Sequence, residues 1–92
     1  MIGRIRHKGL ARFYETGDLR GIDAKRADWL HVLLTTMDQA TVVEDLRLPG
    51  FRLHQLKGNF KGCWAVSVSG NWRLVFRFED GHVTDVDMLD YH

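Results

Sequence analysis

Hydrophobic residues in the first half of the chain recur at helical spacing. In "GLARFYET" the apolar side of a helix would carry Leu10, Phe13 and Tyr14, and Gly17 marks its end. A stronger pattern follows in "DAKRADWLHVLLTTMDQA", where Asp23 can cap the start of a long helix. Its apolar stripe consists of Leu30, Leu33, Leu34, Met37 and Ala40, widened by Trp29 and Val32.

The segments on either side of these helices carry weaker patterns. "IGRIR" near the start predicts a first strand. In "TVVEDLRLP", Thr41 and Glu44 have the spacing of a capping box, and Pro49 prevents a long continuation. This segment therefore predicts a short third helix.

The second half of the chain changes to the two-residue period of β-strands. One strand has Trp64, Val66 and Val68 on one face, and the next has Trp72, Leu74, Phe76 and Phe78 on one face. Gly70-Asn71 and Asp80-Gly81 suit tight two-residue hairpins, and "FRLHQLKG" supplies a strand ahead of them. The last strand is expected to run to the terminal residues, with Val86, Met88, Asp90 and His92 on one side and Leu89 and Tyr91 on the other.

These elements predict an α+β fold in a single domain over residues 1–92. Two to three N-terminal helices would pack on one face of a mainly antiparallel, twisted sheet. A two-residue turn at Gly70-Asn71 pairs Arg73 with Val68 and Arg77 with Trp64. Both arginines then project from the face opposite the helices, and we expect that face to be basic.

Composition places the chain among ordinary globular proteins, with 45% hydrophobic and 27% charged residues. No apolar run approaches the ~20 residues that span a bilayer, so no membrane association is expected. The basic start lacks the apolar core of a signal peptide. Cys63 is a single thiol, which can form neither a disulfide framework nor a Cys-rich zinc site. These features predict a cytoplasmic protein.

The net charge of +1 hides a strong segregation of charge along the chain. Between Asp45 and Glu79 there is no acidic residue, and the last stretch from Glu79 contains no Lys or Arg. The basic block consists of Arg47, Arg52, Lys57, Lys61, Arg73 and Arg77. Clustered Lys and Arg residues commonly bind a nucleic-acid backbone. A solvated basic sheet face without a partner would have the same composition.

Six polar residues remain unexplained by core-building: His54, Lys57, Arg73, Asp90, Tyr91 and His92. Histidine can donate or accept a proton near neutral pH, and Lys and Arg can stabilise negative charge on phosphate. A structural ion pair between Arg73 and Asp90 is the competing interpretation. No metal-ligand spacing and no glycine-rich nucleotide loop occurs in the sequence, so neither a metal nor a cofactor is expected.

Four motifs, taken in order along the whole chain, resemble the HigB toxins of the RelE/ParE superfamily. They are "RHKGL", "LHQLKG", "GNWRLVFRF" followed by a glycine turn, and the terminal "DYH". The resemblance implies a ribosome-dependent endoribonuclease with a compact, microbial-RNase-like fold that cuts messenger RNA in the decoding site of the small ribosomal subunit. It also implies silencing by a helix-turn-helix antitoxin and binding of operator DNA only through the antitoxin complex.

The family's active-site residues, carried over by position, fall on the same six residues: His54, Lys57, Arg73, Asp90, Tyr91 and His92. The basic block adds Arg52, Lys61 and Arg77 as candidate contacts to the RNA backbone. Many relatives have a basic or aromatic residue where this chain has Ser67 and Ser69, a departure that is expected to change how RNA is gripped.

Two other functions are compatible with the fold and the charge pattern. A gyrase inhibitor of the ParE branch would share the fold, although the presence of Lys57, Arg73 and "DYH" argues against it. A basic module that binds RNA or protein without catalysis is the second alternative. Messenger RNA cleavage in a translating extract separates both alternatives from the ribonuclease.

Overall fold

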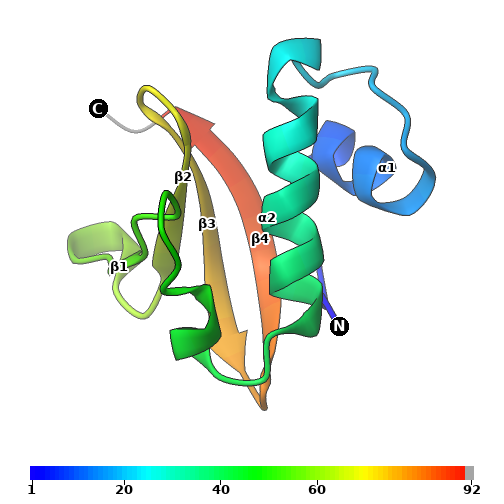
Figure 1. Cartoon of the computed structure of the whole chain (residues 1–92). Helices are drawn as coiled ribbons and strands as arrows, with labels where there is room; N and C mark the ends of the chain where they lie inside the picture. Colours follow the sequence, from blue (N-terminus) through cyan, green and yellow to red (C-terminus); the bar gives the residue numbers. More distant parts are fainter. Residues whose placement is uncertain (91–92) are drawn as a thin grey trace.

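In the computed structural model, which describes residues 1–90, two helices cover one face of a four-stranded antiparallel sheet (Figure 1). The helices are α1 (Lys8–Thr16) and α2 (Ala27–Gln39), and the sheet has the order β1-β2-β3-β4. Its strands are β1 (His54–Gln55), β2 (Trp64–Ser69), β3 (Trp72–Glu79) and β4 (His82–Asp90). Three single 3-10 turns connect these elements: η1 (Ala24–Arg26), η2 (Val43–Leu46) and η3 (Gly58–Phe60). The predicted α+β architecture is confirmed.

The N-terminal segment lies parallel to β4 instead of forming a full strand. Ile2 and Ile5 make isolated parallel bridges to Val83 and Val86. Gly3 permits this approach, because a Cβ at its position would lie 2.6 Å from the Thr84 hydroxyl oxygen. The predicted first strand is therefore present only as two bridges at the β4 edge.

The two helices lie where the periodicity predicts them, but Tyr14, expected on the apolar side of α1, is 36% exposed. His7 caps α1 by accepting a hydrogen bond from the Leu10 amide at 3.0 Å, and Gly17 ends the helix with a φ of 77°. Asp23 caps the short η1 turn that leads into α2 rather than α2 itself. The stripe on α2 is buried as predicted, but Val32 is 44% exposed and does not widen it.

The predicted third helix is only the single 3-10 turn η2. The Asp45 carboxylate accepts from the amides of Thr41 and Val42 at 3.0 and 3.3 Å. Glu44 instead pairs with Arg47 at 2.6 Å, so the predicted capping box between Thr41 and Glu44 is wrong. Pro49 follows three residues after the turn and has no amide hydrogen to donate, which limits its continuation as a helix.

A β-bulge between Ser67 and Ser69 corrects the predicted pairing of β2 with β3. Ser69 pairs with Trp72 across the expected two-residue turn, but Ser67 pairs with Arg73. The extra residue shifts the register by one, so Val66 lies opposite Leu74 rather than Val75. Because of this shift the apolar faces of both strands point to the same core.

A second irregularity interrupts the pairing of β3 with β4 near Asp85, whose φ is 53°. The hairpin at Asp80-Gly81 has two positive φ values, 53° and 80°, as a tight primed turn requires. Val86 and Met88 then face the helices, while Leu89 faces the other side. This confirms the predicted alternation of the last strand for the part that the structure describes.

The sheet separates two apolar clusters of very different size. The main core lies between the helices and the sheet, with Leu30, Leu33, Met37, Leu74 and Phe76 among its fully buried members. The opposite face carries a small cluster of Leu56, Ala65 and Val75, with Phe60, Cys63 and Leu89 packed against it. Arg73 and Arg77 project from this face as predicted, but its centre is apolar and not basic. No helix within residues 1–90 is long and apolar enough to cross a membrane.

Candidate active site

Strand pairing gathers several candidate residues on the sheet face that is turned away from the helices, here called the open face. His54 pairs with Ala65, Ala65 with Val75, and Val75 with Asp87, so these four residues form one row across the sheet. The next row on the same face is Ser67, Arg73 and Leu89. With strands ~4.8 Å apart, the Cα atoms of His54 and Arg73 are separated by roughly 12 Å. Side chains of this length can therefore reach one phosphodiester from two sides.

His54 begins β1 and is exposed to solvent. Its Nδ1 atom lies 2.9 Å from the carbonyl oxygen of Arg52. The backbone of Arg52 is left-handed, with a φ of 52°. The imidazole is thus held by the chain immediately before it.

Lys57 stands at the start of a tight loop that rests on the open face. The preceding residue, Leu56, is buried in the small cluster, and its amide donates to the Cys63 carbonyl at 2.9 Å. Within the loop, the Lys61 amide donates to the Gly58 carbonyl at 3.0 Å. These contacts fix the backbone that carries Lys57, while the ammonium group itself is exposed.

The Arg73 guanidinium is held at the end of the β2–β3 hairpin. Its Nη1 atom donates to the carbonyl oxygens of Gly70 and Trp72 at 2.7 and 3.0 Å. Within residues 1–90, no hydrogen bond engages Nε or Nη2 of Arg73, and planar guanidinium groups bind a phosphate through two parallel hydrogen bonds. The half-buried position of Arg73 limits its motion.

Arg77 lies farther along β3 and extends over the loop. Its Nη1 atom is 3.1 Å from the place where a Cβ would stand on Gly62, so only glycine allows this contact without a shift. Arg77, Arg52 and Lys61 are all exposed, as a role in contacting an RNA backbone requires.

Asp90 closes β4 at the same end of the sheet. It pairs with Trp72, whereas Arg73 pairs with Leu89, so strand alternation directs Asp90 and Arg73 to opposite faces. This register does not favour the ion pair between Arg73 and Asp90 that was the competing interpretation. Tyr91 and His92, the two remaining candidates, lie outside the described residues.

The charge segregation of the sequence becomes a lateral gradient in space. The basic residues lie on β3, the β1 end and the adjoining loop, while the acids follow β4 at the other side, with Asp87 in the same row as His54. Asp87 uses one carboxylate oxygen to accept from the Met88 amide at 2.9 Å. An anionic ligand on the open face is therefore favoured toward β1. Next to β4, the exposed Arg4 and Arg6 of the N-terminal segment offset part of the negative charge.

Arg26 is a supporting residue that the sequence pattern did not single out. Its guanidinium lies over the Trp72 ring at 5.3 Å, and its Nε donates to the Ser69 hydroxyl at 2.8 Å. This contact fixes the β2–β3 hairpin from the helix side. The sequence pattern could not indicate this contact, because Arg26 and Ser69 are 43 residues apart.

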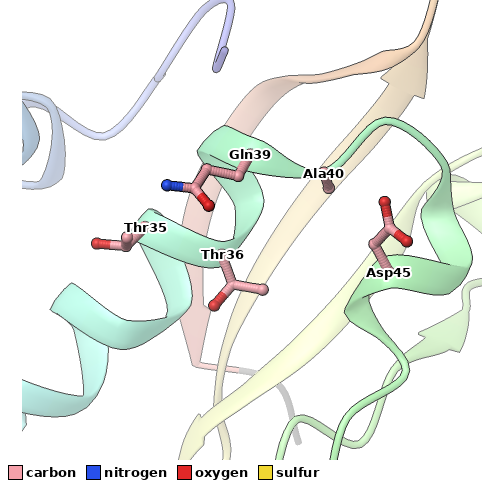
Figure 2. Close-up of a pocket in the computed structure, with 5 residues that line it drawn as sticks. All are labelled: Thr35, Thr36, Gln39, Ala40 and Asp45. Atoms are coloured by element: carbon pink, nitrogen blue, oxygen red, sulfur yellow. The ribbon is translucent and has the colours of Figure 1, made fainter.

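A hollow of about 270 Å³ lies elsewhere, between the last turns of α2 and η2 (Figure 2). Thr35, Thr36 and Gln39 line it from the helix, with Ala40 and Asp45 at the far side. Its only charged lining group, the Asp45 carboxylate, already accepts two backbone amides. A negative lining does not suit a phosphate, and the hollow is remote from the open face. Within residues 1–90, no three His, Cys, Asp or Glu side chains are grouped so that they could hold a metal ion.

The family described as RelE-like toxin of type II toxin-antitoxin system HigB matches residues 3–92. This chain belongs to that family. Endoribonuclease HigB of Proteus vulgaris is 36% identical over 92 residues, which is 100% of each chain. Toxin HigB-1 of Vibrio cholerae is 36% identical over 79 residues, 84% of this chain and 83% of its own. The resemblance carried by the four sequence motifs is thereby confirmed.

Solved structures support the architecture of this HigB-like toxin. A YoeB–YefM complex from Staphylococcus aureus contains a chain that matches with a TM-score of 0.65 at 18% identity, over 100% of this chain and 95% of the other. A heterotetrameric YoeB–YefM toxin–antitoxin complex from the same organism gives 0.65 at 20% identity with the same coverage. At such low identity the likeness establishes the fold, here two helices on a four-stranded antiparallel sheet.

Proposed function

We propose that this HigB-like toxin is a metal-independent endoribonuclease that cleaves messenger RNA on the ribosome and so inhibits translation. The observation that carries the proposal is the strand register, which puts His54 and Arg73 on one open face with Lys57 at its edge. A relative of equal length that is named an endoribonuclease supports it further. The chemistry of these residue types fits transfer of a proton and stabilisation of a phosphorane.

Cleavage would use the 2′-hydroxyl of the RNA as the nucleophile on the adjacent phosphorus. One group must remove the hydroxyl proton and another must protonate the departing 5′ oxygen, and His54 and His92 are the candidates. Lys57 and Arg73 would stabilise the negative charge that develops on the non-bridging oxygens. The guanidinium supplies a planar fork and the ammonium a point charge.

The remaining candidates orient the reactants and the RNA. Because the Asp90 side chain points to the face opposite Arg73, Asp90 would orient a neighbouring side chain at the end of the sheet. Tyr91 would stack on a base or bind a phosphate. Arg52, Lys61 and Arg77 would contact the backbone on either side of the cut. Ser67, in the row of Arg73, leaves a smaller and uncharged surface there than the relatives' bulkier residues would.

Dependence on the ribosome follows from how these groups are held. His54 and Lys57 are exposed to solvent, so burial does not fix their side chains against a substrate. Alignment of reacting groups can contribute roughly 7–11 kcal/mol to a rate, and here the decoding site would supply it by fixing the messenger. Free RNA is therefore expected to be cut slowly or not at all.

The partner of the toxin would be a helix-turn-helix antitoxin. Both matched structures of YoeB are complexes with the antitoxin YefM, which supports an antitoxin partner in general. The pair would bind operator DNA through the antitoxin, and the toxin would act in the cytoplasm, where ribosomes and messenger RNA are found. An open reading frame for a helix-turn-helix protein beside the gene would support this pairing.

A translating extract tests the function directly. Messenger RNA would be incubated with the wild-type protein, with His92→Gln or with Lys57→Ala, and cuts would be mapped by primer extension. Cuts that need both the ribosome and the wild-type residues are expected. Intact message in the wild-type lane would refute the ribonuclease, and loss of DNA supercoiling activity instead would identify a gyrase inhibitor.

The nucleophile can be tested with a single altered nucleotide. A message with a 2′-deoxy nucleotide immediately 5′ of a mapped cut is expected to survive at that position, while a neighbouring unmodified site is still cut. Cleavage of the deoxy site would mean that water attacks the phosphorus, and the residue roles above would then be wrong.

A further inference from the structure

Arg52 has an unusual backbone conformation for its residue type. Its φ of 52° lies in the left-handed region, which residues with long side chains rarely adopt. Within the described residues, the other non-glycine positions in this region are Asp80 and Asp85. Aspartate tolerates the conformation because its short side chain can bond locally, but arginine has no such compensation. Strained residues of this kind concentrate at functional sites, where the surrounding structure holds them.

The neighbours of Arg52 hold it in place from both sides. Phe51 and Leu53 are both buried in the main core, and the Phe51 ring packs edge-on against Trp29 at 5.4 Å. The Phe51 carbonyl accepts from the Ser67 amide at 2.7 Å. Since His54 pairs with Ala65, regular pairing would instead place Arg52 opposite Ser67. Arg52 is thus one extra residue, as in a β-bulge, a device that re-aims neighbouring groups.

The group that this bulge re-aims is the Arg52 carbonyl, which lies 2.9 Å from Nδ1 of His54. A carbonyl oxygen can only accept a hydrogen bond, so Nδ1 must carry the hydrogen. A neutral imidazole carries one hydrogen, which leaves the lone pair on Nε2. The contact therefore selects one of the two neutral forms of the ring.

We propose that the left-handed turn at Arg52 fixes His54 in its Nδ1-protonated form, so that Nε2 is the proton acceptor in RNA cleavage. The proposal rests on the ribonuclease function proposed above. Nε2 takes the proton of the 2′-hydroxyl while the O2′–P bond forms and the P–O5′ bond breaks, giving a 2′,3′-cyclic phosphate. The 5′ oxygen takes its proton from a separate donor, for which the His92 imidazolium is the candidate. Arg52 is a positioning residue that acts through its backbone.

The protonation of the ring can be measured without any activity. Full-length protein labelled with ¹⁵N-histidine would be studied by long-range ¹H–¹⁵N correlation above the pH at which the ring becomes neutral, and His54→Gln would assign the signal. A protonated Nδ1 and an unprotonated Nε2 are expected. The opposite pattern, with hydrogen on Nε2, would overturn the proposal even if the protein cleaves RNA.

A matched pair of variants connects the ring to the backbone. Arg52→Ala and Arg52→Pro both remove the guanidinium, but only proline forces φ to about −65° and displaces the carbonyl. The alanine variant is expected to keep the ring form and to cleave at least tenfold faster than the proline variant. Equal cleavage by both, with His54 of the proline variant protonated on Nε2, would contradict the proposal.

Thermal melts of both variants separate a local effect from loss of the fold. If the proline variant does not fold, the spectra of the wild-type protein and of Arg52→Ala decide the ring form by themselves. An Nδ1-protonated His54 in a protein that cuts no message in a translating extract would refute the ribonuclease function, and with it the role of Nε2, while the structural part of the inference would stand.

Discussion

The two faces of the sheet differ in what covers them and in what they are able to do. The helix face is sealed by α1 and α2 over a continuous apolar core (Figure 1). On the open face, the buried residues within the described part of the chain are only Leu56, Ala65 and Val75. The polar candidates His54 and Arg73 flank this small cluster. One face therefore supplies most of the stability, and the other presents the residues of the proposed site.

This division has a physical cause. Burial of apolar area is non-directional and accumulates with the size of the cluster, so a large core stabilises the whole sheet. Reactive groups must reach solvent and substrate, so they cannot be sealed in the same way. The open face instead uses local devices: a left-handed turn at Arg52, a bulge at Ser67 and a tight loop after Lys57. Substitutions on the two faces should consequently separate stability from activity.

The largest effect is expected from truncation in the helix-face core. Phe76 is fully buried, and Phe76→Ala should lower the free energy of unfolding by about 3–5 kcal/mol. Urea denaturation followed by circular dichroism measures this loss. Phe78→Ala, on the same strand but only partly buried, is the control and should cost clearly less. Equal losses at the two positions would contradict the assigned core.

Arg73→Ala should produce the largest loss of activity at little cost in stability. Removal of a well-placed charge donor costs about 10²–10³-fold in rate, and Arg73→Lys should recover only part of it because the planar fork is missing. Primer extension in a translating extract measures the rate. Arg12→Ala, an exposed arginine on α1, controls for the loss of one positive charge. A comparable loss of cleavage rate in Arg12→Ala would mean that Arg73 acts only through the net charge of the protein.

Leu56→Ala is expected to affect both stability and activity, because Leu56 anchors the Lys57 loop on the sheet. Stability should fall by about 2 kcal/mol, at the lower end for a buried leucine in a small cluster. Faster hydrogen exchange of the amide at position 56, which donates to Cys63, and a severalfold slower cleavage should accompany it. Leu48→Ala, at an exposed leucine, should leave both nearly as they are.

The smallest effect is expected where the two helices are joined by a polar contact. The Tyr14 hydroxyl donates to Asp38 at 2.6 Å, and this bond holds the pKa of the Asp38 carboxyl below its ordinary value of 3.8. Burial, together with Asp38, raises the pKa of Tyr14 to about 12. Tyr14→Phe should cost about 0.5–1.5 kcal/mol at neutral pH, as for a single hydrogen bond.

The pH dependence of the same variant has a defined sign. A lowered pKa of Asp38 means stability that is present above pH 3.8 and is lost as the pH falls through the folded value. A raised pKa of Tyr14 means stability that is present below pH 10.0 and is lost as the pH rises toward about 12. Melting curves of Tyr14→Phe should therefore converge with those of the wild type at both extremes. Asp38→Asn, which cannot titrate, should remove the acid part and weaken the alkaline part, because Asp38 contributes to the raised pKa of Tyr14.

The periodicity of the sequence predicted the helices and hairpins because their apolar residues all face one core. Leu30, Leu33 and Met37 on α2 are buried as expected, and the turn at Asp80-Gly81 has the required backbone. The pairing of β2 with β3 could not be predicted. A bulge at Ser67 adds one residue to β2 without changing the alternation of apolar and polar residues in the sequence. The cap of the short η2 turn was assigned to the wrong acid for a similar local reason: Asp45 accepts from the Thr41 amide, whereas Glu44 pairs with Arg47.

Most of the candidate site was also visible in the sequence, as residue types without a place in the core. Its spatial arrangement was not, since it depends on which strands pair and in which register. For example, Arg73 pairs with Leu89 while Asp90 pairs with Trp72, and only this register shows that Arg73 and Asp90 point to opposite faces. The contact between Arg26 and Trp72 likewise joins segments that the chain separates widely.

The sequence alone determined the architecture, the charge segregation and the chemical inventory of this protein, because those properties depend on local spacing and composition. Tertiary structure decided which of these groups share a face, which carbonyl meets the His54 ring, and how the loop of Lys57 rests on the sheet. Long-range pairing and bulges set those relations, and a one-residue change in register reverses them.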